Sequence, residues 1–303
     1  MSTVAPVGLG VEPSGDLLVA TDLSYAYLGR FPALDRLSLT IRRGERLALV
    51  GANGCGKSTL LKVLDGLMFA DSGTYQAFGH AVTEDALEDE QYNEGFRSRV
   101  GFVFQNSDAQ VFSPTVREEI AFGPLNMGLD RAQVAQRVDD TLAMLDIADL
   151  ADRAPYQLSG GEKKRVAIAS VLVMNPEVLL FDEPTAALDP RTQQWLVELL
   201  AALHRAGKTI VVATHDLATL PQIADRCAVF SEQHQIVAEG PVAKVLADTE
   251  LLRAVNLLHA HAHRHGPVTH SHEHGLDHHH DDDHDHDHDD PGHDRGHDRG
   301  EPA

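Results

Sequence analysis

The stretch GANGCGKST, residues 51–59, decides the fold. It matches the pattern G-x-x-x-x-G-K-[S/T], follows the strand-like run RLALV (residues 46–50) and opens a helical stretch that ends at Gly66. Glycines let the backbone curl so that several N–H groups point at a phosphate, and the helix start adds a favourable dipole. The sequence therefore predicts a phosphate-binding loop, made of Gly51, Asn53, Gly54, Cys55, Gly56, Lys57, Ser58 and Thr59.

Three side chains of this loop can be interpreted individually. Lys57 is expected to reach the β- and γ-phosphates of a nucleotide, and Ser58 to hold Mg²⁺. Cys55 is either a reactive thiol, because it lies near Lys57 and a helix start, or a small residue that fills a tight turn. The second interpretation is preferred. The chain has only one other cysteine, Cys227, and no pairing pattern, which is typical of a reducing cytosol.

A second motif, VLLFDEP (residues 178–184), is an apolar run that ends in two carboxylates. Asp182 at the end of the strand is positioned to hold Mg²⁺ through water. Glu183 would face the γ-phosphate and polarise an attacking water as a general base. Paired carboxylates can also simply keep a loop soluble, but the phosphate loop upstream favours the catalytic interpretation.

Apolar strand-like runs alternate with helical stretches along most of the chain, which predicts an α/β fold with a parallel sheet covered by helices on both faces. Residues 1–17 are expected to be a flexible leader and residues 18–258 the folded domain. Within that domain, residues 80–99 are charged and expected to be exposed, and residues 107–175 are expected to be mostly helical. Two runs, CAVFS and QIVAEG, predict a closing hairpin.

The formal net charge is −21, and the segments before and after residue 259 are both acidic. A general electrostatic attraction to nucleic acid is therefore not expected. The first residues lack the basic start and apolar run of a secretory signal, and no uninterrupted apolar run is long enough to span a bilayer.

Four motifs together carry a family resemblance: GANGCGKST, LSGGEKKRVAIAS (residues 158–170), LLFDEPTAALDP (residues 179–190) and VVATHD (residues 211–216). The combination resembles the nucleotide-binding subunit of ATP-binding cassette (ABC) transporters over residues 18–258. The resemblance implies ATP and Mg²⁺ as ligands and ATP hydrolysis coupled to transport. It also implies a P-loop NTPase (RecA-like) core with an antiparallel β subdomain and an α-helical signature subdomain.

The resemblance also implies roles for residues outside the phosphate loop. Tyr27 would stack on adenine, Gln105 would touch Mg²⁺ and sense the transport partner, and His215 would contact the γ-phosphate. Asp189 would lie at a dimer seam. The residues that would contact the γ-phosphate of the opposite subunit are Ser159, Gly160 and Gly161, followed by Glu162, where many family members have glutamine.

The SGG sequence directly precedes a helical run, so its serine hydroxyl and free N–H groups predict a second anion site. The chain already has one phosphate loop, so this second site is expected to serve a neighbour's nucleotide. A head-to-tail dimer follows, closed by symmetry with ATP at the seam. ATP would favour the closed state because it contacts both halves only there.

Residues 102–129 indicate a subtype. An Asn-x-Asp-x-Gln run (Asn106, Asp108, Gln110) followed by SPTV and AFGPLN resembles the energy-coupling-factor importers. Members of that group drive integral membrane subunits that take up vitamins or transition-metal ions, so this chain is expected at the cytoplasmic face of the membrane. Alternatively, these residues only shape the surface of the helical subdomain.

Residues 259–303 contain fifteen histidines, against four in the rest of the chain, with aspartates between them. The segment lacks apolar residues to bury, so it is predicted to be disordered. Imidazole and carboxylate suit Ni²⁺, Co²⁺, Zn²⁺ or Cu²⁺. The candidate ligands are His261, His263, His272, His274, His278, His279, His280, His284, His286 and His288.

This tail favours uptake of cobalt or nickel as the function. Three alternatives stay open: a vitamin importer whose tail buffers metal incidentally, a soluble cassette ATPase unconnected with transport, and a metal buffer or metallochaperone. A solvated low-complexity tail has the same composition, whereas a purification tag would be a compact histidine run.

Overall fold

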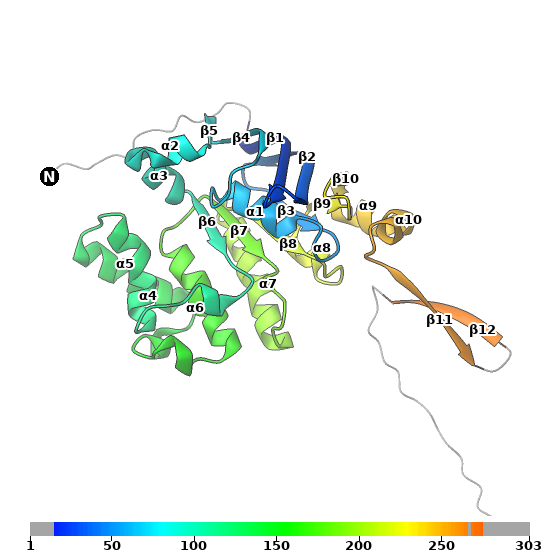
Figure 1. Ribbon diagram of the computed structural model, residues 1–303. Helices are drawn as coiled ribbons and strands as arrows, with labels where there is room; N and C mark the ends of the chain where they lie inside the picture. The colour runs from blue at the N-terminus through cyan, green and yellow to red at the C-terminus, as the bar shows by residue number, and fades with distance from the viewer. Residues whose placement is uncertain (1–14, 266–267, 275–303) are drawn as a thin grey trace, which may run out of the picture.

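The computed structural model describes residues 15–265 and 268–274. Its centre is a six-stranded sheet in the order β10-β9-β3-β8-β7-β6 (Figure 1). The strands are β3 Arg46–Val50, β6 Val100–Val103, β7 Val178–Asp182, β8 Thr209–Thr214, β9 Arg226–Phe230 and β10 Ile236–Pro241. All neighbours are parallel except β10, which pairs antiparallel with β9 as the predicted hairpin. Every residue of β7 and β8 is buried, which explains their continuous apolar sequences.

A second sheet has four antiparallel strands in the order β2-β1-β4-β5. Its strands are β1 Asp16–Tyr27, β2 Phe31–Arg42, β4 Ser72–Ala77 and β5 His80–Ala81. The helix α1 Lys57–Leu64 contributes Leu60 and Leu61 to a core shared by both sheets. The first strand begins at Asp16, two residues before the predicted domain boundary, and residues 1–14 lie outside the described part.

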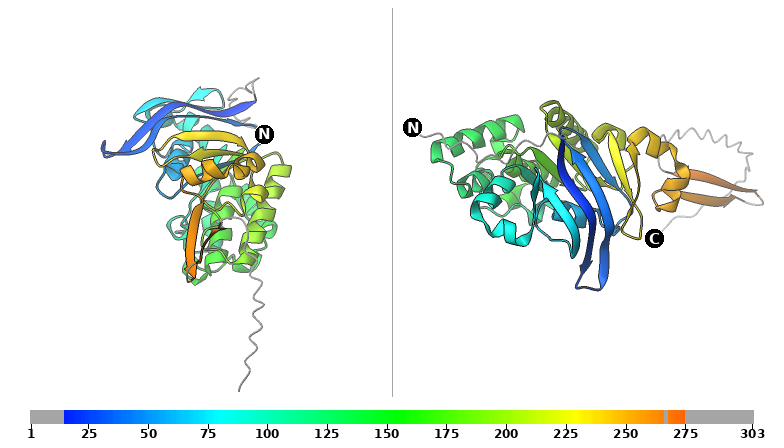
Figure 2. Two further views of the ribbon diagram at one scale, coloured as in Figure 1. Left: turned by 90° about the vertical axis from the view of Figure 1, so that its right-hand side faces the viewer. Right: turned by 90° about the horizontal axis from the view of Figure 1, so that it is seen from above.

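The helical subdomain consists of α4 Val116–Asn126, α5 Arg131–Met144 and α6 Gly160–Leu172, with the short 3-10 turns η1 Ser107–Ala109, η2 Ala148–Leu150 and η3 Pro155–Gln157. These helices lie together beside the β6 edge of the large sheet (Figures 1 and 2). Their apolar faces meet in one core, which includes Ile120, Val138 and Ile168. The predicted helical character of residues 107–175 is confirmed.

The remaining helices are α2 Glu84–Glu88, α3 Glu90–Arg97, α7 Pro190–Arg205, α8 Leu220–Ile223, α9 Val242–Ala247 and α10 Thr249–Ala254. The charged segment 80–99 is exposed or half-buried as predicted, except for Val82 and Phe96. Phe96 is 1% exposed, and the Arg97 guanidinium donates hydrogen bonds to the carbonyl groups of Asp65 and Gly66. Within residues 15–265 and 268–274, no helix is both long and apolar enough to cross a membrane.

After α10 the backbone forms a two-stranded antiparallel hairpin, β11 His259–His265 and β12 Val268–His274. The predicted disorder of residues 259–303 therefore does not hold for these two strands. Alternating histidine with small or polar residues has the two-residue period of a strand, although it supplies little apolar surface. The predicted ligands His278, His279, His280, His284, His286 and His288 lie outside the described residues.

Candidate nucleotide-binding site

Four neighbouring parallel strands bring one group of the predicted site residues to one edge of the large sheet. In the order β3, β8, β7, β6, the strands are followed by the phosphate loop, by His215, by Glu183 and by Gln105. The register aligns these strand ends, since Val50 pairs with Thr214 and Asp182 pairs with Ala213. Crevices at the carboxyl ends of parallel strands are the usual ligand sites of open α/β sheets.

The phosphate loop curls tightly around the Lys57 ammonium. Lys57 is 5% exposed, and its Nζ donates hydrogen bonds to the carbonyl oxygens of Gly51 at 2.7 Å and Ala52 at 3.1 Å. The curl depends on Gly56, whose φ is 112° and where an added Cβ would lie 2.1 Å from the carbonyl oxygen of Ala33. A buried cation inside a ring of backbone suits a phosphate group.

Ser58 and Asp182 meet although they are far apart in the sequence. The Ser58 hydroxyl donates a hydrogen bond of 2.8 Å to Asp182 Oδ1, and Asp182 is 5% exposed. Burial raises the pKa of the Asp182 carboxyl, and the hydrogen bond from Ser58 opposes that rise. A hydroxyl and a carboxylate beside a phosphate loop are a donor set that fits Mg²⁺.

Glu183 is held from two sides. Its Oε1 lies 2.9 Å from His215 Nδ1 and 3.7 Å from Lys57 Nζ, and its side chain is almost fully buried. Its backbone N–H donates to the carbonyl oxygen of Ala213, and its φ is 42°, an unusual conformation for glutamate that is often found at functional sites. The geometry therefore fixes one carboxylate oxygen beside the phosphate loop, where it can accept a proton.

Tyr27 lies at the end of β1 and reaches the same edge. Its hydroxyl is 3.1 Å from Thr59 Oγ1, and the edge of its ring packs against Tyr25 with the ring centres 5.0 Å apart. The side chain remains partly exposed. The small antiparallel sheet thus places an aromatic ring beside the start of α1, as stacking on a base requires.

Cys55 belongs to the core rather than to the reactive groups of the loop. It is 2% exposed and packs in the cluster of apolar side chains shared by the two sheets. Burial raises the pKa of its thiol, against the opposing effect of the Lys57 charge. A reactive thiol needs a lowered pKa, so the structure supports the small-residue interpretation.

The predicted second anion site lies at the start of α6. The Ser159 hydroxyl accepts from the Glu162 N–H at 3.3 Å, and Glu162 Oε2 accepts from the Ser159 N–H at 2.7 Å. These hydrogen bonds lower the pKa of the Glu162 carboxyl. Glutamate at position 162 therefore completes a capping box, which explains how the chain accommodates this departure from the common family pattern.

Residues 159–162 form one wall of a groove of about 850 Å³, here called the signature groove. Asp189 lines it too and caps α7, accepting from the Thr192 hydroxyl at 2.6 Å. The two helix starts approach so closely that an added Cβ on Gly161 would lie 3.0 Å from Thr192 Oγ1. None of the phosphate-loop residues lines this groove, so the predicted site residues form two groups.

Sequence reasoning missed Lys164, which joins the two groups. It is 3% exposed, and its Nζ donates to the carbonyl oxygens of Phe104 at 3.1 Å and Gln105 at 3.0 Å. Burial lowers its pKa to about 8, although the Asp182 charge acts in the opposite direction. The available signal was its helical spacing, because Lys164 precedes the buried Ile168 by one turn.

The Asn-x-Asp-x-Gln run supports the same connection. Gln110 accepts from the Phe104 N–H at 3.0 Å and donates to the Ala167 carbonyl at 3.1 Å. Asp108 accepts from Lys163 Nζ at 2.6 Å. These residues attach the segment around Gln105 to α6. Such contacts are consistent with the alternative interpretation, in which residues 102–129 only shape the helical subdomain. The side chain of Gln105 itself is exposed.

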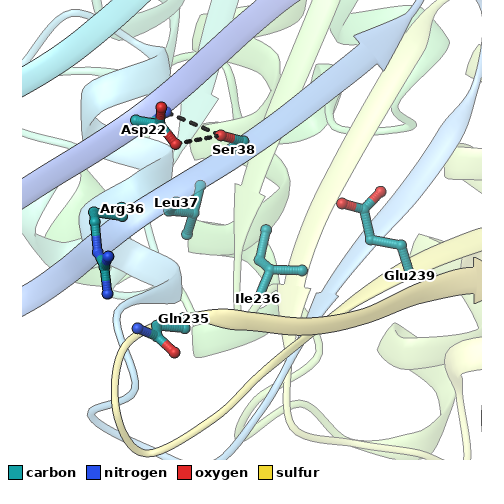
Figure 3. Close-up of a pocket in the computed structure, with 7 residues that line it drawn as sticks. All are labelled: Asp22, Arg36, Leu37, Ser38, Gln235, Ile236 and Glu239. Atoms are coloured by element: carbon teal, nitrogen blue, oxygen red, sulfur yellow. Dashed lines mark hydrogen bonds between the residues drawn. The ribbon is translucent and has the colours of Figure 1, made fainter.

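A further hollow of about 450 Å³ lies between the strands β1 and β2 and the segment that includes β10 (Figure 3). Asp22 and Ser38 are hydrogen bonded on its wall, where Arg36 and Glu239 are also found. No predicted site residue is among those that line it.

Comparisons with known proteins agree with this geometry. A family model described as ABC transporter matches residues 34–186. The nickel import ATP-binding protein NikO of Rhodobacter capsulatus is 49% identical over 239 residues, covering 78% of this chain and 93% of NikO. The energy-coupling factor transporter ATP-binding protein EcfA of Methanothermobacter thermautotrophicus is 43% identical over 236 residues, covering 78% of this chain and 74% of EcfA.

Among solved structures, cbiO1 from Clostridium perfringens, part of the ABC transporter complex cbiONQ, superposes with a TM-score of 0.69 at 37% identity. The match covers 80% of this chain and 96% of cbiO1. The fold is thus that of an ABC cassette ATPase. The chain belongs to the ATP-binding proteins of ABC transporters and is an ATP hydrolase coupled to transport. The predicted family and fold class are confirmed.

Proposed function

We propose that this chain is the ATPase subunit of a membrane importer, that it hydrolyses ATP at a head-to-tail dimer interface, and that the cargo is a transition-metal ion, cobalt or nickel. The proposal of ATP hydrolysis is based on the position of Glu183. One oxygen of its carboxylate lies between His215 and Lys57, next to the bonded pair Ser58 and Asp182.

In the proposed reaction, the N–H groups of the phosphate loop and Lys57 bind the β- and γ-phosphates, and Tyr27 stacks on adenine. Glu183 accepts a proton from a water molecule whose oxygen attacks the γ-phosphorus, and the bond to ADP breaks. His215 orients Glu183 and contacts the γ-phosphate. Ser58, Asp182 and Gln105 would hold Mg²⁺, which neutralises phosphate charge when bound.

The signature groove supports the dimer. The α6 start offers backbone N–H groups and the Ser159 hydroxyl to an anion, but no phosphate-loop residue lines the groove. A second copy in head-to-tail orientation would bring its own nucleotide to Ser159, Gly160 and Gly161, with Asp189 at the seam. ATP would then bridge two chains, and hydrolysis would release them.

Two observations support a transition-metal cargo. The chain resembles a nickel import ATP-binding protein over most of its length, and its residues 259–303 contain fifteen histidines. Imidazole is a preferred ligand of late first-row metal ions. We place the chain at the cytoplasmic face of the membrane, bound to integral membrane subunits, because its relative cbiO1 is part of an ABC transporter complex.

The test is metal accumulation in a strain that lacks this gene. Restoring the wild-type chain should restore nickel or cobalt uptake at limiting metal, whereas Glu183→Gln should not. A chain without residues 259–303 should keep full ATPase activity and lose part of the uptake. If gene deletion lowers only the uptake of a vitamin, the cargo assignment is wrong. Unchanged accumulation without the tail excludes a transport role for the tail.

The second candidate is an energy-coupling-factor ATPase for vitamin uptake, with a tail that buffers metal incidentally. The similarity to EcfA favours it. The same strain discriminates the two, because a vitamin importer would leave nickel and cobalt accumulation unchanged when the gene is deleted.

A further inference from the structure

Two side chains attach the backbone that follows β6 to the helix α6. The strand β6 ends directly before Phe104 and Gln105. Lys164 of α6 donates to both of their carbonyl oxygens, at 3.1 and 3.0 Å. The side-chain amide of Gln110 accepts from the Phe104 N–H at 3.0 Å and donates to the Ala167 carbonyl of α6 at 3.1 Å. Side chains therefore hold this backbone where strand pairing ends.

Lys164 occupies a position where a positive charge is costly. Its side chain is 3% exposed, and Ile168, one turn later on the same helix, is fully buried. A methionine could fill this space without the cost of removing a charge from water. The hydrogen bonds to Phe104 and Gln105 give the charge a specific use, because they satisfy two carbonyl groups beyond the end of the strand.

The helix α6 connects this attachment to the signature groove. Lys164 lies about one helical turn after Gly160, which lines that groove. The helix packs closely on the large sheet, since an added Cβ on Gly101 of β6 would lie 2.4 Å from Val171 Cγ1. Because a packed helix moves as a unit, a shift of its start carries Lys164 and the carbonyl groups bound to it.

We propose that Lys164 and Gln110 are positioning residues for ATP hydrolysis, because they make Gln105 and the start of α6 move together. Neither side chain touches the reacting atoms. A nucleotide held at Gln105 would favour one position of α6, and a neighbour's nucleotide held at the start of α6 would favour the matching position of Gln105. The inference rests on the proposed head-to-tail dimer and deepens it, since it names the contacts that connect the two sites within one chain.

The main test compares Lys164→Met and Gln110→Met with the wild-type full-length chain. Both remove hydrogen bonds to the backbone of residues 104 and 105, so kcat for ATP hydrolysis should fall about 10- to 100-fold. ATP affinity without Mg²⁺, which reports the phosphate loop, should stay within about twofold. A purely structural role would lower the free energy of unfolding and leave kcat of the folded chain unchanged. Gln110 is only half-buried, so Gln110→Met tests the proposal even if Lys164→Met does not fold.

A double-mutant cycle shows whether Lys164 acts through Gln105. If it does, Lys164→Met should reduce kcat little further in a chain that already carries Gln105→Ala. Combined with Tyr27→Ala, which removes the proposed contact with adenine, the same substitution should give additive losses. Additive losses with Gln105→Ala would contradict the positioning role.

Dimerisation separates a failure of this inference from a failure of the proposed dimer. In the Glu183→Gln background, Lys164→Met should weaken ATP-driven dimerisation about tenfold. The matched control Lys163→Met removes the neighbouring lysine, whose partner Asp108 is largely exposed, and should change neither kcat nor dimerisation. If Glu183→Gln alone does not dimerise with ATP, the proposed dimer is wrong. If it dimerises equally well with and without Lys164→Met, only the positioning role is wrong.

Discussion

The phosphate loop and the signature groove are both proposed anion sites at helix starts, but they are built in different ways. Around the phosphate loop, Lys57, Asp182 and Glu183 are each at most 6% exposed, and the hydrogen bond from Ser58 to Asp182 spans 124 residues of sequence. In the signature groove, the bonds join Ser159 with Glu162, and Asp189 with residues two or three positions further on.

In the proposed dimer, this difference separates the site that a single chain completes from the site that needs a second chain. The phosphate loop is assembled by the sheet, so one chain can bind a nucleotide. The signature groove is assembled by local capping, and Ser159 and Gly160 at the start of α6 are exposed. Nucleotide binding and ATP-driven dimerisation should therefore respond to different substitutions.

The largest expected effect is that of Glu183→Gln. The amide keeps the shape of the side chain but cannot accept the proton, so ATP hydrolysis should fall by about 10²–10⁴-fold. ATP should be retained and the dimer should accumulate, because release depends on hydrolysis. Phosphate release and size-exclusion chromatography with light scattering measure both. The control Glu198→Gln removes an exposed carboxylate on α7 and should change neither. Rapid turnover by Glu183→Gln would remove Glu183 from the role of base.

Lys57→Ala should weaken ATP binding, the step that precedes hydrolysis. Removing the ammonium from the loop eliminates its contact with the phosphates, so ATP affinity of the isolated chain should fall by about 10- to 100-fold. Titration with ATP measures it. The control is Lys244→Ala, which removes one positive charge from the exposed surface of α9 and should leave ATP affinity unchanged. Equal ATP affinity for the wild-type chain and Lys57→Ala would contradict the phosphate-loop assignment.

Ser159→Ala should separate the two sites. ATP affinity of the isolated chain should stay unchanged, whereas ATP-driven dimerisation, measured in the Glu183→Gln background, should weaken about tenfold because a phosphate contact is lost. Loss of the cap should also lower the free energy of unfolding by about 1 kcal/mol. Thr115→Ala removes the corresponding cap of α4 and should cost similar stability without affecting the dimer. A parallel loss of ATP affinity in Ser159→Ala would mean that the two sites are not independent.

The contrast between locally built and distantly built sites also explains how much of the structure could be predicted from the sequence. Motifs that lie within a few residues, such as the phosphate loop and the SGG helix start, are visible because their geometry is local. The buried strands were visible as continuous apolar runs. The helices α2 and α3 were missed because they are short, five and eight residues, and Phe96 is their only buried residue. The hairpin β11–β12 was missed because its alternation is of histidine rather than of apolar residues.

Contacts between distant segments could not be predicted in detail. No local pattern specifies that one oxygen of Glu183 lies between His215 and Lys57, because the order of strands in the sheet decides it. Lys164 was missed for a different reason. A lysine in a helix is usually exposed, and this one can be buried because the carbonyl groups of Phe104 and Gln105 accept hydrogen bonds from its Nζ.

The smallest expected effect concerns this connection between the sites, and it appears in the pH dependence of stability. Burial lowers the pKa of Lys164 to about 8 in the folded chain, against an ordinary lysine value of 10.5. Below pH 8 both states are protonated, so the cost of burying the charge is constant. Between pH 8 and 10.5 the folded chain has lost the proton and the unfolded chain still holds it, so stability should rise with pH.

Comparison with Lys164→Met isolates this contribution, because other titrating groups cancel in the difference. From pH 7.5 to pH 10, the free energy of unfolding of the wild-type chain should rise relative to Lys164→Met by an amount on the order of 2 kcal/mol. Urea unfolding at both pH values measures it. Lys163→Met, which removes the ion pair with Asp108, should show no comparable rise, since that carboxylate is largely exposed. A difference between wild type and Lys164→Met that does not change with pH would mean that burial does not lower the pKa of Lys164.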